Sequence, residues 1–300
     1  MTSIGTNGFY QRSIEGLASL RRKTEAMQTQ LATGQRLSRA SDDPAAAARL
    51  AILGRADARA AIDTTNANRA TADLTLADQT IATIADQAAR VRELATEAST
   101  GILSNQQRAS IAAELNQLHS GFMALANTRN STGQALFGGS GSGDAYSLDA
   151  GGNAVYGGTA QAGELSLGEG LSVRRGLTGP EVFGTGSKDL LATIKTLADA
   201  MGGGATDPAT AAKDMLGALA DGIDTISTGQ TVVGARLAWI DLTTAQAQDR
   251  GEVRAEEQAA IGGTDLTRTI AELQQMSLVL EASQASFVRL SGLSLFNLLN

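Results

Sequence analysis

The sequence has 300 residues, a formal net charge of −7 at pH 7 and 3% aromatic residues. A negative chain lacks the basic face that binds nucleic acid or an anionic membrane surface, so neither is an expected partner. The chain has no cysteine and one histidine, His119. This excludes a thiolate nucleophile and any site built on two histidines, and we expect no cofactor and no metal.

The sequence gives no sign of membrane insertion or of a cleaved leader. No apolar run approaches the roughly 18 residues that span a bilayer. The first residues, MTSIGTNGFYQRSIEG, lack a basic segment followed by an apolar one. We therefore expect a cytoplasmic protein, or one that leaves the cell by a route that needs no such signal.

The first predicted helix carries apolar and small residues at alternating spacings of three and four, which is the pattern of a coiled-coil seam. The seam residues are Leu17, Leu20, Thr24, Met27, Leu31 and Gly34. Tyr10 and Ile14 add apolar surface toward the N-terminus. This helix is predicted to present one apolar stripe to a partner helix.

Two adjacent carboxylates, Asp42 and Asp43, stand before Pro44 and an alanine-rich run. Acid–base chemistry needs two carboxyls in separate environments within a cleft, and a metal needs further ligands, which the neighbouring sequence does not supply. Asp43 as the N-cap and Pro44 as the first helical residue account for the pattern. We interpret the pair as a helix start.

A second seam is cleaner than the first. It comprises Leu74, Ala77, Ile81, Ile84, Ala88, Val91, Ala95 and Ala98. Its alternating small residues favour close approach of helix axes. Gly101 is predicted to end this helix, and Ser104 with Gln107 to cap the next one. That helix carries Ile111, Leu115, Leu118, Phe122 and Leu125, and His119 is predicted to be a partly exposed helix residue on it.

The composition changes in residues 136–186, which are rich in glycine with scattered aromatics, as in turns and short strands. Two glycine-rich loops, GGSGSGD and FGTGSKD, lack the strand and spacing of a phosphate-binding loop. The second of them leads into a predicted helix. We expect a small β-rich insertion.

Helical patterns return at residue 187 and continue to the end of the chain. One helix carries Leu190, Leu191, Ile194, Leu197 and Met201, and a long one carries Met215, Leu219, Ile223, Ile226, Val233, Leu237 and Ile240. After Gly262 and Gly263, a last helix presents Leu266, Ile270, Leu273, Leu280 and Phe287. The final residues, LSGLSLFNLLN, are strongly apolar.

The fold class predicted is mainly α: a long antiparallel helical rod or coiled coil built from both termini, with a small β-rich insertion in the middle. Three domains are expected: 1–40 with 265–300, 41–135 with 187–264, and 136–186. The terminal helices are richer in apolar residues than one partner helix can cover, which indicates burial between subunits. The expected interface residues are Tyr10, Ile14, Leu17, Leu20, Met27, Leu31, Leu273, Leu280, Phe287, Leu290, Leu295 and Phe296.

Three functional classes compete for such a chain. A helical rod without a pocket is unlike an enzyme, and residues 136–186 contain no histidine or cysteine for an inserted active site. A cytoplasmic coiled-coil adaptor shares the seams but does not account for the apolar tail. A self-associating structural protein accounts for both, and no catalytic residue is expected.

Three stretches resemble the superfamily of bacterial flagellins and hook-associated proteins: QLATGQRLSRASDDPAAAARL, RVRELATEAST and EASQASFVRLSGLSLFNLLN. The resemblance covers roughly residues 1–135 and 205–300. SDDP, STGQALFGGSGSG and the GLSLFNLLN ending resemble the hook–filament junction proteins (hook-associated protein 3), whereas the TN at residues 6–7 is flagellin-like. The junction family is therefore favoured, with flagellin as the alternative.

The resemblance implies an extracellular axial protein of the flagellum, exported by the type III route without a cleaved signal peptide. Its implied partners are other copies of itself, hook-associated protein 1, flagellin and an export chaperone. The terminal segments are expected to order on assembly into an inner coiled-coil layer. Residues 32–44 would then form the elbow to an outer layer, shaped by Gly34 and Pro44 together with Asp42 and Asp43.

Overall fold

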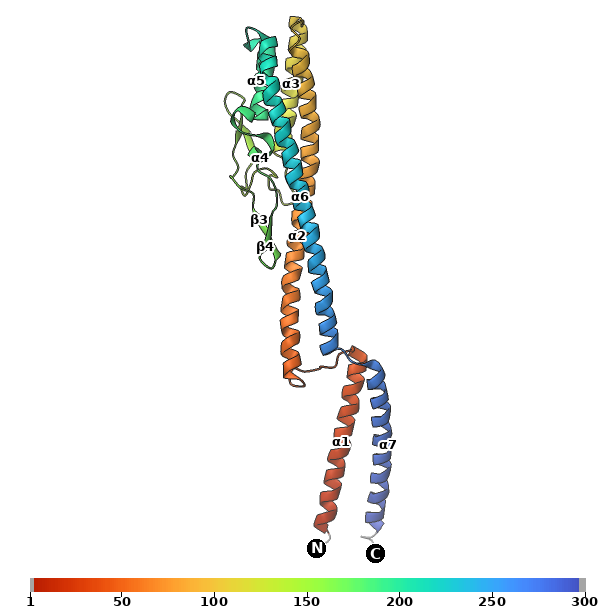
Figure 1. The fold of residues 1–300 in the computed structure, drawn as a ribbon. Helices are drawn as coiled ribbons and strands as arrows, with labels where there is room; N and C mark the ends of the chain where they lie inside the picture. The colour runs from red at the N-terminus through yellow and green to blue at the C-terminus, as the bar shows by residue number, and fades with distance from the viewer. Residues whose placement is uncertain (1–2, 297–300) are drawn as a thin grey trace. The chain divides into compact units, whose positions relative to one another are not determined.

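The computed structural model describes the backbone of residues 3–296 and the side chains of residues 10–289. The elements run in the order α1 (Ser3–Thr33), α2 (Pro44–Ala98), α3 (Asn105–Ala126), β1 (Tyr146–Leu148), β2 (Ala154–Tyr156), β3 (Glu164–Gly168), β4 (Leu171–Arg174), α4 (Gly179–Phe183), the 3₁₀ turn η1 (Gly186–Lys188), α5 (Leu190–Asp199), the π-helical turn η2 (Ala200–Gly204), α6 (Pro208–Gly262) and α7 (Leu266–Phe296) (Figure 1). The predicted mainly α fold with a small β-rich segment is confirmed. The chain forms two compact units, Met1–Ala58 with Arg250–Asn300, and Arg59–Asp249.

The core of the 59–249 unit is built on the predicted seam of α2. All eight seam residues are buried, and Leu74, Ile81, Ile84, Ala88, Val91 and Ala95 are fully inaccessible to solvent. Helix α3 lies along the C-terminal half of α2, where Arg90 Nε is 2.7 Å from Glu114 Oε1. The alanines of the seam are themselves buried, so side chains of other elements close over this side of α2.

Helices α5 and α6 complete this core with the residues that the sequence pattern predicts. Leu190, Leu191, Ile194 and Leu197 of α5 are fully buried, as are Leu219, Ile226 and Val233 of α6. The two helices touch at Gly222, where an added Cβ would lie 3.1 Å from Leu190 Cδ1. A small residue therefore sets the spacing of α5 and α6 at this point.

The predicted helix caps are present in the connection between α2 and α3 and at the start of α5. Ser104 and Gln107 form the capping box at the start of α3, with each side chain bonded to the other residue's backbone N–H. Gly101 adopts a φ of 77° after α2 ends. Asp189 caps α5 by accepting a hydrogen bond from the N–H of Ala192, so the FGTGSKD segment is a helix-capping loop.

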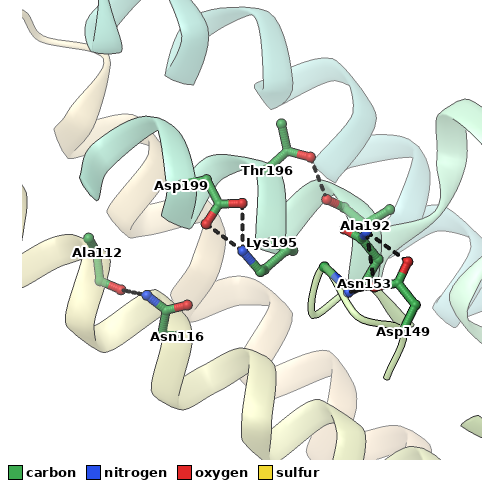
Figure 2. A network of polar contacts seen from close by, with 9 residues as sticks. Ala112, Asn116, Asp149, Asn153, Ala192, Lys195, Thr196 and Asp199 are labelled. Carbon is green, nitrogen blue, oxygen red and sulfur yellow. Dashed lines mark hydrogen bonds and ion pairs between the residues drawn. The ribbon is translucent and has the colours of Figure 1, made fainter. Parts of the chain in front are cut away.

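The middle segment contains two separate antiparallel hairpins among its described residues, β1–β2 and β3–β4. In the first, Asp149 Oδ1 accepts hydrogen bonds from the N–H groups of Gly151 and Asn153 and so closes the turn (Figure 2). Short strands were predicted here, but helix α4 was not. Phe183 of α4 packs edge to face on Tyr146 with ring centroids 5.5 Å apart, which anchors the hairpin in the helical core.

The prediction for His119 is wrong, because the imidazole is buried rather than partly exposed. Its exposed fraction is 6%, and its Nε2 atom has no hydrogen-bond partner. The buried stripe of α3 includes Ala112 and Ala126, and His119 lies on the same side. Burial lowers the pKa of His119, and Lys195, which pairs with Asp199 on α5, lowers it further (Figure 2).

The complete burial of Ala88 predicts the effect of enlarging this residue. Ala88→Leu is expected to destabilise the protein by about 1–3 kcal/mol, because a buried seam has no room for three added carbons. The measurement is the midpoint of urea denaturation. Ala82 is exposed on the same helix, so Ala82→Leu is the matched control, with an expected change within about 0.5 kcal/mol. Equal midpoints for the two variants would contradict this packing.

The lowered pKa of His119 predicts a pH dependence of stability. The unfolded chain binds the proton near the ordinary pKa of 6.5, whereas the folded chain binds it only at lower pH. The contribution of neutral His119 to the free energy of unfolding is therefore complete above pH 6.5 and declines as the pH falls toward the lowered pKa of the folded chain. We expect the free energy of unfolding of the wild type, relative to His119→Gln, to fall between about pH 7.5 and pH 5. Parallel pH curves for the two proteins would refute this.

Candidate assembly interface

Helices α1 and α7 form an antiparallel pair within the Met1–Ala58 and Arg250–Asn300 unit (Figure 1). At one end of the pair, the N–H of Thr264 donates to the carbonyl of Gly34 over 3.0 Å. Toward the other end, the rings of Tyr10 and Phe287 meet edge to face with centroids 5.7 Å apart. The first and last helices are thereby paired, as the matching seams predicted.

The predicted interface residues occupy different positions on this pair. Leu17 and Leu20 are half-buried and line the space between the helices together with Phe287. The half-buried group also includes Tyr10, Met27, Leu31, Leu273 and Leu280. Ile14 instead faces solvent with 56% of its side chain exposed. Leu290, Leu295 and Phe296 have side chains outside the described residues.

An apolar groove of about 440 Å³ runs between the two helices. It is lined by Ser13, Gly16, Leu17, Leu20, Val279, Ala282, Ser283, Ser286 and Phe287. The serine, glycine and alanine residues among them leave the groove open, and the leucines, Val279 and Phe287 make its lining apolar. A cavity of this shape is filled by side chains from another helix more readily than by solvent.

Helix α7 exposes more apolar surface than its pattern predicts. Leu266 and Ile270 were expected on the partner-facing stripe, but they are 52% and 46% exposed. Thr269 is buried in their place, because the register of α7 on α1 turns that side inward. Leu278 and Val288 are 68% and 67% exposed on the same helix. A two-helix pair covers one stripe of each helix, and the remainder is surface that favours self-association.

The connection from α1 to α2 holds the predicted elbow. Gly34 ends α1 with a φ of 68°, a conformation that a residue with a Cβ rarely adopts. Its N–H donates to the carbonyl of Gln30 over 2.8 Å. Pro44 is the first residue of α2. The chain therefore leaves α1 through a glycine in the left-handed conformation and enters α2 through a proline, whose fixed φ suits the first turn of a helix.

The two carboxylates of the elbow are engaged in backbone hydrogen bonds. Asp43 Oδ1 accepts from the N–H of Ala46 over 3.0 Å, which is the predicted N-cap. Asp42 Oδ2 accepts from the N–H groups of Arg39 and Ser38 over 2.9 and 3.2 Å. These bonds lower the pKa of both carboxyls, with Ala46 as the main cause for Asp43 and Arg39 for Asp42. The described residues contain no group of three or more potential metal ligands.

Arg36 makes contacts in the elbow that were not predicted from the sequence. Its N–H donates to the carbonyl of Gly262 over 2.8 Å. Its guanidinium contacts the carbonyl of Ile261 at 3.0 Å and Asp43 Oδ2 at 3.3 Å. A cation at the last carbonyls of α6 complements the negative end of the helix dipole. Arg36 lies within the QLATGQRLSRASDDPAAAARL stretch that carries the family resemblance, but only the fold shows its partners.

The start of α2 is tied to the end of α6 by charged pairs that are distant in the sequence. Arg49 makes two hydrogen bonds to the carboxylate of Glu257, at 2.6 and 2.9 Å. Arg254 Nε bonds Asp57 Oδ1 at 2.7 Å. Bidentate geometry fixes the orientation of the paired helices as well as their contact. The connection is therefore followed by a helix pair, α2 and α6, that these ion pairs hold in contact.

Comparison with known proteins identifies the family. Residues 4–142 match the bacterial flagellin N-terminal helical region. The chain is 25% identical to flagellar hook-associated protein 3 of Escherichia coli (strain K12), over 98% of this chain and 99% of that protein. The chain belongs to the flagellar hook-associated protein 3 family. It is also 23% identical to flagellar hook-associated protein 3 of Salmonella typhimurium, over 98% and 99% of the two chains.

Solved structures share the fold of this hook-associated protein 3 family member. A putative flagellar hook-associated protein from Vibrio parahaemolyticus gives a TM-score of 0.68 at 19% identity, over 74% of this chain and 100% of that one. Hook-associated protein 3 from Legionella pneumophila gives 0.64 at 14% identity, over 70% and 98%. FlgL from Xanthomonas campestris gives 0.61 at 18% identity, over 69% and 99%.

The family assignment decides between the competing classes. Hook-associated protein 3 is the hook–filament junction protein of the flagellum, a structural protein and not an enzyme. The preference for the junction family over flagellin is therefore confirmed. None of the described helices has the length and apolar character that crossing a membrane requires.

The cap at the elbow predicts a graded series of substitutions. Asp43→Ala removes the acceptor for the Ala46 N–H and is expected to speed hydrogen exchange at the start of α2 roughly several-fold. Asp43→Ser supplies another capping oxygen and is expected to retain most of the protection. Pro44→Ala keeps the cap and should be mild. The measurement is hydrogen exchange in the first turn of α2. Unchanged exchange in Asp43→Ala would contradict the capping role.

Proposed function

We propose that this chain forms the junction layer between the hook, through hook-associated protein 1, and the flagellin filament. In this proposal α1 and α7 of neighbouring copies pack together as the inner part of the layer. The observation that supports it is the apolar surface left uncovered on the α1–α7 pair, with its open groove and its exposed Leu278 and Val288. Burial of that surface between copies would supply the free energy of assembly.

The isolated α1–α7 pair has little to hold it together before assembly. Its seam residues Leu17, Met27 and Leu31 are half-buried, whereas the seam of α2 is fully buried. A helix pair with an incomplete core is marginal in water and gains stability from each further helix that covers it. We infer that α1 and α7 become fully ordered only in the layer, and that the elbow connects them to the rest of the chain.

We propose that the chain reaches its place outside the cell by the flagellar type III export route, without a cleaved signal peptide. A cytoplasmic chaperone would cover the C-terminal helix until export. The exposed apolar residues of α7 support a need for such cover, because free surface of this kind promotes premature association. The absence of cysteine removes any disulfide that would impede passage as an extended chain.

The position of the protein in the flagellum can be tested directly. Gold-labelled antibody against this chain, applied to isolated flagella and viewed by electron microscopy, is expected to mark one narrow band between hook and filament. Label along the whole filament would identify a filament subunit instead. Absence of label from hook and filament would contradict an axial role altogether.

Leu31→Asp tests the assembly role of the α1–α7 pair. A carboxylate on the half-buried stripe of α1 is costly to cover with apolar helices, so the variant is expected to form no junction layer and to give non-motile cells. It should appear in the culture medium, because export does not depend on the stripe being covered. Ala82→Asp, on the exposed side of α2, is the control. Normal junctions built from Leu31→Asp protein would argue against the proposed inner layer.

A further inference from the structure

The connection from α1 to α2 and the connection from α6 to α7 form a short antiparallel ladder. The N–H of Arg36 donates to the carbonyl of Gly262 over 2.8 Å, and the N–H of Thr264 donates to the carbonyl of Gly34 over 3.0 Å. These two bonds flank an isolated antiparallel β-bridge between the middle residues of the two segments. Both connections belong to the same compact unit, so the ladder is a feature of that unit alone.

Arg36 contacts the ends of three helices from its place in this ladder. Its carbonyl accepts a hydrogen bond from Gln30 Nε2 of α1 over 2.9 Å. Its guanidinium donates to the Ile261 carbonyl at the end of α6, through Nε at 3.3 Å and through Nη2 at 3.0 Å. The same Nη2 atom lies 3.3 Å from Oδ2 of Asp43, which caps α2. One side chain therefore joins segments that are 225 residues apart in the sequence.

The surroundings of Arg36 suit a charged and planar donor. A guanidinium keeps its charge at physiological pH and holds its N–H groups in a fixed plane, so it can bond two acceptors in one geometry. One acceptor is a carbonyl at the negative end of α6, and the other is the carboxylate of Asp43. The side chain of Arg36 is 45% exposed, so these contacts form without the full cost of burying a charge.

The ladder is attached more firmly to α2 and α6 than to the terminal helices. An added Cβ on Gly262 would lie 3.2 Å from Leu50 Cδ1, so α2 packs closely on the end of α6. Arg49 and Glu257 join the same two helices through two hydrogen bonds. Helices α1 and α7, in contrast, leave most of their seam residues half-buried. The support on the α2 and α6 side lets the ladder stay closed while α1 and α7 still lack further partners.

We propose that Arg36 is a latch that keeps the start of α7 beside the end of α1 in the free chain, before other copies cover the two terminal helices. With the latch closed, α1 and α7 begin at fixed neighbouring points. Their pairing is then an intramolecular event at high effective concentration and in one register. This inference rests on the proposed function for the assembly that follows, whereas the latch itself is a property of the single chain.

The latch can be tested with two spin labels, because the chain has no cysteine of its own. Ala32→Cys on α1 and Thr267→Cys on α7 replace exposed residues on the two sides of the ladder. The labelled full chain is diluted with unlabelled chain, so that pulsed electron paramagnetic resonance measures distances within one molecule. We expect one narrow distance distribution in this parent protein. Arg36→Gln removes the charge and the planar donor, and it is expected to abolish that narrow distribution.

Two control variants separate the latch from its surroundings. Arg39→Gln changes an exposed arginine of the same connection and keeps the backbone N–H that donates to Asp42. Phe287→Ala removes the ring contact with Tyr10 toward the other end of the helix pair. Both controls are expected to keep the narrow distribution.

Three results would overturn the proposal: broad distances in the parent protein, narrow distances in Arg36→Gln, or broadening in either control. The distances are measured in the free chain. They therefore support or overturn the latch whatever position immunogold labelling finds for the protein in the flagellum.

Discussion

The burial of one continuous stripe along α2 is the constraint on which the rest of the structure depends. Its alanines and larger residues share one buried core with residues of α3, α5 and α6, and the hairpin segment is anchored on the same core through Tyr146 and Phe183. The terminal helices have no such enclosure. Each packs on the other, and most of their seam residues remain half-buried. The two units therefore differ in how fully they bury their own apolar residues, and this difference underlies the proposed assembly through α1 and α7.

Polar contacts then fix the geometry that packing alone leaves free. Arg36 contacts the last carbonyls of α6 and the capping carboxylate Asp43, so the end of one helix and the start of another share one cation. The pairs Arg49–Glu257 and Asp57–Arg254 hold the helices that continue from this point. Individually, exposed pairs contribute little to stability. Together they hold the start of α2 against the end of α6.

The junction role proposed above uses the surface of the terminal pair. That pair offers apolar surface with a groove and with Leu278 and Val288 exposed. Burial of apolar surface is the main source of association energy. The 59–249 unit, in contrast, buries the stripe of α2 within a single chain.

The sequence by itself determined the helical class, the seam of α2, the caps at Ser104 and Asp43 and the pairing of the two ends, because periodicity and capping are local properties of the chain. It also pointed to the family through short motifs near both termini. Only the tertiary structure decided that His119 is buried, that Leu266 and Ile270 face outward, and that Arg36 reaches α6. Those outcomes depend on the rotation of one helix against another and on contacts between residues far apart in sequence, which a single helical pattern does not specify.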